Sequence, residues 1–106
     1  MIETTDEPME NAWNILPGEA KEFFYYGVGV PFEVEVANLN PELEASYVAQ
    51  SVGGECGWSL YRRFTGRSES LMLDWFCSIG RFTNTSTIAV IRISGDAIRL
   101  YNGEES

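Results

Sequence analysis

Two cysteines, Cys56 and Cys77, carry the most reactive side chains of this 106-residue chain. A thiol becomes a catalytic nucleophile when a nearby base activates it, and the chain contains no histidine to do so. The two positions are too far apart for a CxxC redox pair, and a zinc site requires further Cys or His ligands. The thiols therefore either form a disulfide between two strands or pack as small hydrophobic groups. The acidic start MIETTDEPME is unlike a secretory signal peptide, which favours free thiols.

Two glutamates and a glycine pair offer other chemistry. Glu33 and Glu35 are two residues apart, so on a strand both carboxylates point to one face. Such a pair could join a calcium site or act in glycoside hydrolysis, but the spacing selects neither over solvated side chains. Gly27-Val28-Gly29 has the glycines of a phosphate-binding loop, yet an alternating strand follows where that loop requires a helix. The sequence predicts no metal, no cofactor and no enzymatic activity.

Aromatic residues beside arginines are more informative about function. Trp58 and Tyr61 precede three arginines, and Trp, Tyr and Arg together are the composition of protein-interface hot spots. In Phe23-Phe24-Tyr25-Tyr26 alternate side chains leave the core, so two aromatic rings face outward. The alternative is that these aromatic residues fill the core and rim of a small sandwich. The predicted interface residues are Trp58, Tyr61, Arg62, Arg63, Arg67, Phe24, Tyr26, Ile88, Val90 and Arg92.

Charge is distributed unevenly along the chain, whose net charge is −9. Residues 1–61 contain many acidic residues against Lys21 alone, whereas residues 62–99 contain an excess of arginine. Acidic surface opposes contact with nucleic-acid phosphates or an anionic membrane, so we expect protein partners. A dipolar chain also favours head-to-tail contacts between copies, with a trimer-like ring as one outcome, although simple solvation of the charges is the alternative.

Apolar alternation predicts about eight short β-strands. The clearest are Phe32–Val36, with Glu33 and Glu35 on its outer face, and Thr87–Ser94, both of whose faces are partly apolar. A strand of the second kind needs cover from another segment or another subunit on its outer face. Asn40–Ala45 is predicted as a helical turn capped by Asn40, and Asn84-Thr85-Ser86, which matches a glycosylation acceptor, as a loop. The other predicted strands are Asn11–Leu16, Ala20–Tyr26, Ser46–Val52, Trp58–Phe64, Ser70–Phe76 and Ala97–Tyr101.

Regular turns between short strands predict an all-β fold, a single antiparallel β-sandwich of the small jelly-roll or immunoglobulin-like kind. We expect residues 1–10 to form an acidic mobile arm, residues 11–101 the sandwich, and residues 102–106 an acidic tail. No apolar stretch approaches the roughly 20 residues that a membrane-spanning helix needs. The expected location is therefore a virion or the cytoplasm.

These features predict a non-catalytic, homo-oligomeric protein that docks on a larger protein assembly. The most specific form of this hypothesis is a virion decoration or cement protein of a phage capsid. Two alternatives stay open: a phage-encoded acidic inhibitor that mimics nucleic acid, and a carbohydrate-binding sandwich that uses Trp58 or Trp75.

Overall fold

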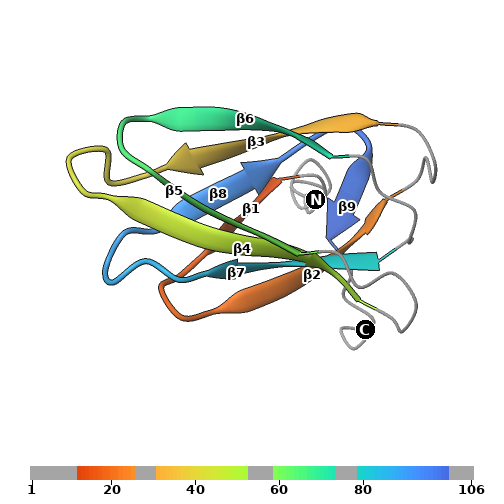
Figure 1. Cartoon of the computed structure of the whole chain (residues 1–106), viewed down its shortest axis with the longest axis horizontal. Helices are drawn as coiled ribbons and strands as arrows, with labels where there is room; N and C mark the ends of the chain where they lie inside the picture. The colour runs from red at the N-terminus through yellow and green to blue at the C-terminus, as the bar shows by residue number, and fades with distance from the viewer. Residues whose placement is uncertain (1–11, 26–30, 53–58, 74–78, 101–106) are drawn as a thin grey trace, which may run out of the picture.

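The computed structural model describes residues 12–25, 31–52, 59–73 and 79–100, which form nine strands in two layers (Figure 1). One sheet has the order β1-β8-β3-β6 and the other β5-β4-β7-β2-β9, and all pairings are antiparallel. We call them the four-stranded and the five-stranded sheet. The strands are β1 (Ala12–Ile15), β2 (Ala20–Tyr25), β3 (Phe32–Asn38), β4 (Ala45–Ser51), β5 (Ser59–Phe64), β6 (Ser68–Leu73), β7 (Ile79–Asn84), β8 (Ile91–Ser94) and β9 (Ile98–Leu100).

The pairing pattern identifies the sandwich as a jelly roll. Strand β1 pairs with β8, β2 with β7, β3 with β6 and β4 with β5. Such nested pairs arise when one long antiparallel ribbon is wound so that alternate pairs enter opposite sheets, which gives the eight-stranded double Greek key. Strand β9 extends the five-stranded sheet beside β2. The predicted all-β sandwich is thus confirmed, and of its two forms the jelly roll is the one observed.

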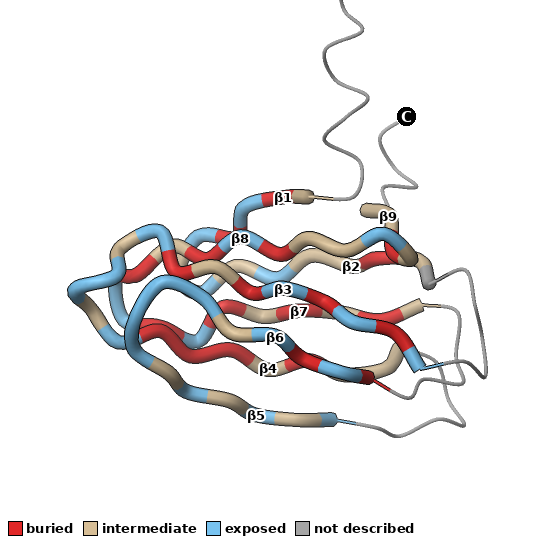
Figure 2. The backbone as a smooth tube through the Cα atoms, turned by 90° about the horizontal axis from the view of Figure 1, so that it is seen from above, coloured by how far each residue is buried: buried red, intermediate tan, exposed pale blue. Residues whose placement is uncertain are grey.

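Alternation along the strands directs one set of side chains between the sheets. In β3, Phe32, Val34 and Val36 are buried while Glu33 and Glu35 are exposed, as the sequence predicted. Figure 2 shows this alternation as buried and exposed segments along the β3 tube. Because the period is two residues, a slip of one residue would expose the valines, so burial fixes the register.

A row of aromatic rings forms the centre of the core. Phe23 stacks on Phe82 with ring centroids 5.2 Å apart, and Phe82 lies 5.9 Å from Tyr47. Trp13 and Phe64 extend the row at its two ends, each 6.3 Å from its neighbouring ring. These rings come from five strands of both sheets, so one contact chain joins the layers.

Asn84 holds one end of the sandwich together. Its side chain is fully buried, and Nδ2 donates hydrogen bonds of 2.8 Å to the carbonyl oxygens of Ile15 and Ala89. Its Oδ1 accepts a bond from the Ser86 N–H, also 2.8 Å. The backbone of Asn84 bonds to Glu19 and Gly18 in the β1–β2 turn. Asn84 is therefore a structural residue at the end of β7, and its buried amide is not presented as a glycosylation acceptor.

Asn38 and Asn40 organise the neighbouring connections at the same end. Asn38 Nδ2 donates to the Leu43 carbonyl, and its Oδ1 accepts from the Asn40 N–H. Asn40 Oδ1 accepts a 2.9 Å bond from the Val90 N–H. The predicted helical turn over Asn40–Ala45 is wrong: Leu43 N–H bonds the Asn40 carbonyl in a tight turn, and the Asn40 side chain reaches the β7–β8 connection. We call this end of the molecule the asparagine end.

The central strand of the five-stranded sheet, β7, was not predicted. Its inward positions are Gly80, Phe82 and Asn84, so a single large apolar side chain marks its buried face. The other strands were predicted with shifts of up to four residues at their ends. The connections β1–β2 and β5–β6 contain Gly18 and Gly66, which have positive φ, 82° and 98°.

Strand β8 is shorter than predicted. Ala89, Ile91 and Ile93 are buried as expected, but regular pairing begins at Ile91 rather than Thr87. Residues 87–90 instead follow the asparagine end, where the carbonyl of Val90 accepts the Leu39 N–H. Among the described residues no helix is long and apolar enough to cross a membrane.

Asn84→Ala should lower the free energy of unfolding by about 2–4 kcal/mol. The substitution leaves two buried carbonyl oxygens and the Ser86 N–H without their partner, and each such loss typically costs about 1 kcal/mol or more. Urea unfolding of the variant beside Thr87→Ala, at an exposed position in the same connection, measures the difference. A loss below about 1 kcal/mol would show that Asn84 does not hold this end.

Candidate interaction surfaces

The predicted arginine cluster lies along β5, the outer strand of the five-stranded sheet, and is divided between two faces. Tyr61 and Arg63 point away from the core, and Tyr61 is 56% exposed. Arg62 points the other way, towards the edge between the sheets, where its Nε lies 3.5 Å from Glu69 Oε2. Arg63 Nε lies 3.1 Å from Glu44 Oε2 at the surface. Tyr61, Arg62 and Arg63 therefore do not form one continuous contact surface.

Arg62 belongs to a polar link between the sheets. The buried Tyr47 hydroxyl of β4 donates a 2.6 Å hydrogen bond to Glu69 Oε2 of β6, the same oxygen that Arg62 approaches. Burial raises the pKa of Tyr47 well above its usual value, and the hydrogen bond and negative charge of Glu69 raise it further, against a lowering by Arg62. This link joins the two sheets along the edge formed by β5 and β6.

The remaining predicted interface residues occupy different places. Arg67 is exposed in the β5–β6 turn, and Phe24 is half-buried on the outer face of β2, beside Ile79 of β7 and Arg99 of β9. Trp58 and Tyr26 lie outside the described residues, as do Cys56, Cys77 and Trp75.

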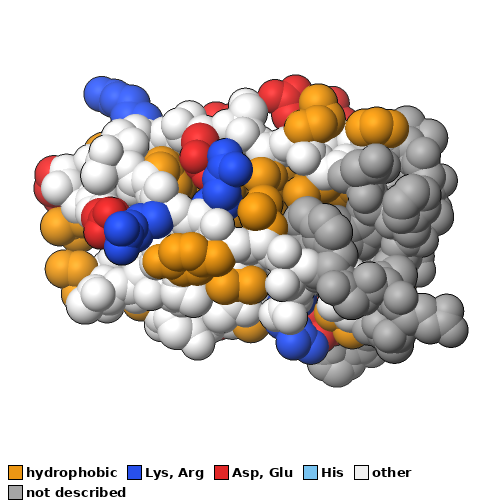
Figure 3. All heavy atoms as spheres, in the orientation of Figure 1, with side chains coloured by type: hydrophobic (Ala, Val, Ile, Leu, Met, Phe, Trp, Pro, Cys, Tyr) orange, Lys and Arg blue, Asp and Glu red, His pale blue; other side chains and the backbone are white. Residues whose placement is uncertain are grey.

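Of the predicted group Ile88, Val90 and Arg92, Arg92 lies on the outer face of β8, and Ile88 and Val90 lie in the β7–β8 connection that leads into it. Leu39 bonds Val90 through the backbone, and the antiparallel registers, extended by one residue, place Leu16 on the other side of Val90. Ile88 is 62% exposed and Leu39 41% exposed. Figure 3 shows some hydrophobic side chains at the left end of the molecule, where Figure 1 places the β3–β4 and β7–β8 connections. We call Leu39, Ile88 and Val90 the apolar cluster. The sequence predicted Ile88 and Val90 as interface residues but not Leu39, which the backbone hydrogen bond places beside Val90.

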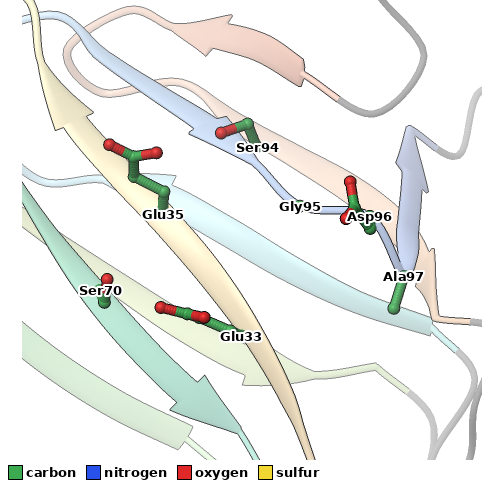
Figure 4. Close-up of a pocket in the computed structure, with 7 residues that line it drawn as sticks. All are labelled: Glu33, Glu35, Ser70, Ser94, Gly95, Asp96 and Ala97. Carbon is green, nitrogen blue, oxygen red and sulfur yellow. The ribbon is translucent and has the colours of Figure 1, made fainter.

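An acidic groove of about 450 Å³ lies at the opposite end of the same face. Glu33 and Glu35 project from β3, with Ser70 of β6 on one side and the β8–β9 connection on the other (Figure 4). That connection contributes Asp96, and Gly95 approaches β3 so closely that a Cβ there would meet the Glu33 carbonyl oxygen at 3.1 Å. The groove is lined by Glu33, Glu35, Ser70, Ser94, Gly95, Asp96 and Ala97.

The groove offers hydrogen-bond acceptors and negative charge. No arginine or lysine lines it, and within the part of the chain that the structure describes its three carboxylates form no ion pair. No group of three or more Cys, Asp or Glu side chains in the described ranges is arranged to hold a metal ion. The groove can therefore receive cationic or hydroxyl-rich groups from a partner.

Fold and surfaces together define a jelly-roll β-sandwich domain with an apolar and an acidic region on one sheet face. No family model matches the chain, and no curated protein matches it. Among solved structures, a mutant of a functionally unknown conserved protein from Bacillus anthracis aligns with a TM-score of 0.54 at 11% identity, over 92% of this chain and 24% of that chain. This likeness shows the fold and nothing about activity.

Two further structures align at lower scores. Drosophila melanogaster CENP-C bound to CAL1 has a TM-score of 0.44 at 10% identity, over 93% of this chain and 69% of that chain. CapF with the inhibitor 3-isopropenyl-tropolone has a TM-score of 0.47 at 9% identity, over 86% of this chain and 24% of that chain. The chain thus spans about a quarter of CapF and of the Bacillus protein.

Stability should fall as the pH rises above about 10, because of Tyr47. An unfolded tyrosine loses its proton near its ordinary pKa of about 10, whereas native Tyr47 keeps its proton to higher pH. The contribution of Tyr47 is therefore complete below about pH 10 and decreases above it by about 1.4 kcal/mol per pH unit. Unfolding of wild type and Tyr47→Phe between pH 9 and 11 measures this, since the variant lacks the titrating group. Equal slopes for the two proteins would contradict the prediction.

Reversing Arg62 should destabilise the fold, whereas reversing Arg63 should not. Arg62→Glu places a second carboxylate beside the half-buried Glu69, so we expect a loss of about 1–3 kcal/mol. Arg63→Glu removes a well-exposed ion pair with Glu44, which typically contributes less than about 1 kcal/mol. Chemical unfolding at neutral pH compares the two, and equal losses would refute the placement of Arg62 between the sheets.

Proposed function

We propose that this protein is a non-catalytic interaction domain that docks on a larger protein assembly through the apolar cluster. The exposure of Leu39 and Ile88 beside Val90 is the observation that carries the proposal. Large apolar side chains that are grouped on a small sandwich with a complete core mark a contact site more often than isolated ones do. The cluster lies on connections that the asparagine end fixes, so a partner meets a preformed surface.

The partner is a protein rather than a nucleic acid or an anionic membrane. A net charge of −9 opposes phosphates, and the apolar cluster offers burial instead of charge. The most specific form of the proposal is a virion decoration or cement protein. The jelly roll is shared by viral capsid domains, lectin domains and cupins, so the fold supports this form without selecting it.

Carbohydrate binding is a second candidate, which the acidic groove favours. Its carboxylates can accept hydrogen bonds from sugar hydroxyls, and its serine hydroxyls can donate or accept them. A small number of such polar groups orients the ligand in a binding site. An acidic mimic of nucleic acid receives less support, because Arg92 lies on the same face and interrupts the acidic surface.

Docking through the apolar cluster predicts that Leu39→Asp and Ile88→Asp each weaken binding to the assembly at least tenfold. A partner that binds the immobilised wild-type protein is purified first. The dissociation constant of its complex with each of the two variants is then measured, with Thr87→Asp as the control at a neighbouring exposed position. Burial of apolar surface is not screened by ions, so wild-type affinity should change little between low and high salt.

The same measurements separate the alternatives. Full affinity in both cluster variants would reject docking through this surface. Loss of glycan binding in Glu33→Gln with Glu35→Gln, while the cluster variants still bind the glycan, would establish the carbohydrate candidate instead. A steep loss of affinity with salt, together with dependence on the same two glutamates, would indicate an acidic mimic.

A further inference from the structure

Four exposed side chains form a diagonal across the outer face of the four-stranded sheet. Asn14 pairs with Arg92, and Leu16, the residue that follows the end of β1, lies two residues beyond Asn14 in the direction of the asparagine end. Arg92 pairs with Ala37, two residues from Glu35 on β3. Glu35 in turn pairs with Ser70, two residues from Met72 on β6. Each step thus crosses one strand and advances two residues, which gives the order Leu16, Arg92, Glu35, Met72; we call this set the diagonal.

The order of chemistry along the diagonal is apolar, cation, anion, apolar. Leu16 is 55% exposed and Met72 65% exposed, so both ends present apolar surface. Arg92 Nε bonds the Asn14 amide oxygen at 3.0 Å, and among the described residues neither Arg92 nor Glu35 has an ion-pair partner. Both charges are available to a second molecule.

We propose that the diagonal pairs with the diagonal of a second copy of this chain. A two-fold axis that lies in the interface, perpendicular to the diagonal and midway between Arg92 and Glu35, reverses the order of the four side chains. Arg92 of each copy then faces Glu35 of the other, and Leu16 of each faces Met72 of the other. Two ion pairs form at the centre of the contact and two apolar contacts at its ends. The inference rests on the proposed function, since it identifies one partner of an interaction domain.

The crossing angle of the two sheets agrees with this pairing. Strands about 4.8 Å apart and steps of about 6.7 Å along them incline the diagonal by about 35° to the strands, so the strands of the two copies cross at about 70°. That angle is near the orthogonal class of sheet packing. Ser70 and Ser94, which pair with Glu35, and Ala37, which pairs with Arg92, are small, whereas Asn14 also pairs with Arg92 and Glu33 pairs with Met72.

Charge complementarity favours a second copy over an unrelated occupant. A partner that satisfied the diagonal would need an anion and a cation at one spacing with apolar groups outside them, and the reversed diagonal supplies that set. The strands β1, β8, β3 and β6 have 4, 4, 7 and 6 residues, which gives a face of roughly 330 Å², less than half of the ~800 Å² that each partner of a standard interface buries. We therefore expect weak pairing that is visible at tens to hundreds of micromolar.

The test exchanges the two charges. Sedimentation equilibrium at about 0.15 M salt measures the dimer dissociation constant for wild type, Arg92→Glu, Glu35→Arg and the double variant. Each single variant should weaken the dimer at least tenfold, because like charges then face each other, and the double variant should return to within about threefold of wild type. Glu42→Arg, at an exposed turn position outside the diagonal, makes the same charge change as Glu35→Arg and should leave the dimer unchanged. Circular dichroism and thermal unfolding check that each variant is folded.

Other outcomes overturn the pairing without ambiguity. Single variants that dimerise like wild type would place self-association on another surface. Wild type that stays monomeric at several hundred micromolar, or a double variant that does not recover, would also reject the pairing. Docking on the assembly through Leu39 and Ile88 is measured separately and with different variants, so the proposed function can stand when the pairing fails.

Discussion

The buried amide of Asn84 is the contact on which the presentation of the surface depends. Its three side-chain hydrogen bonds join the end of β1, the end of β7 and the β7–β8 connection, which would otherwise bury unpaired carbonyl groups. Asn38 and Asn40 continue the network to the β3–β4 turn. These bonds fix the backbone beside three exposed apolar side chains, since Leu16, Leu39 and Ile88 are next in sequence to Ile15, Asn38 and Ala89.

Nested strand pairing redistributes the charge of the chain. The first half of the sequence is acidic and the second half is rich in arginine, but a jelly roll pairs early strands with late ones. Glu22 of β2 consequently lies 2.9 Å from Arg81 of β7, and Glu44 near Arg63. Ion pairs within the fold thus neutralise part of the charge separation that the sequence suggested. The head-to-tail ring was predicted from that charge separation; it has less support now and stays a prediction. Among the described strand residues, Glu33, Glu35 and Arg92 of the four-stranded sheet form no ion pair.

The sequence was informative where burial alone determines the pattern. Phe32, Val34 and Val36 alternate with glutamates, so both the strand and its two faces could be predicted. Strand β7 could not be predicted, because its buried face consists of Gly80, Phe82 and Asn84 and so lacks an apolar alternation. Asn84 is buried because it donates hydrogen bonds to carbonyl groups of other segments, which the sequence does not reveal. Surfaces follow the same rule: Ile88, Val90 and Arg92 share one stretch of sequence, whereas Leu16, Leu39 and Met72 join them only through cross-strand register.

The two proposals, docking and self-pairing, would be coupled through local concentration. An assembly that repeats its docking site brings bound copies close together, and tethered neighbours experience effective concentrations that reach the millimolar range. A contact too small to hold a dimer in dilute solution can then form on the assembly, and each contact strengthens the docking of both copies. The apolar cluster would determine where each copy binds, and the diagonal would stabilise copies that are bound at adjacent sites. Together the two proposals would describe a domain that binds neighbouring sites of a repeating surface cooperatively, because a weak contact between copies adds to docking only where the sites are adjacent.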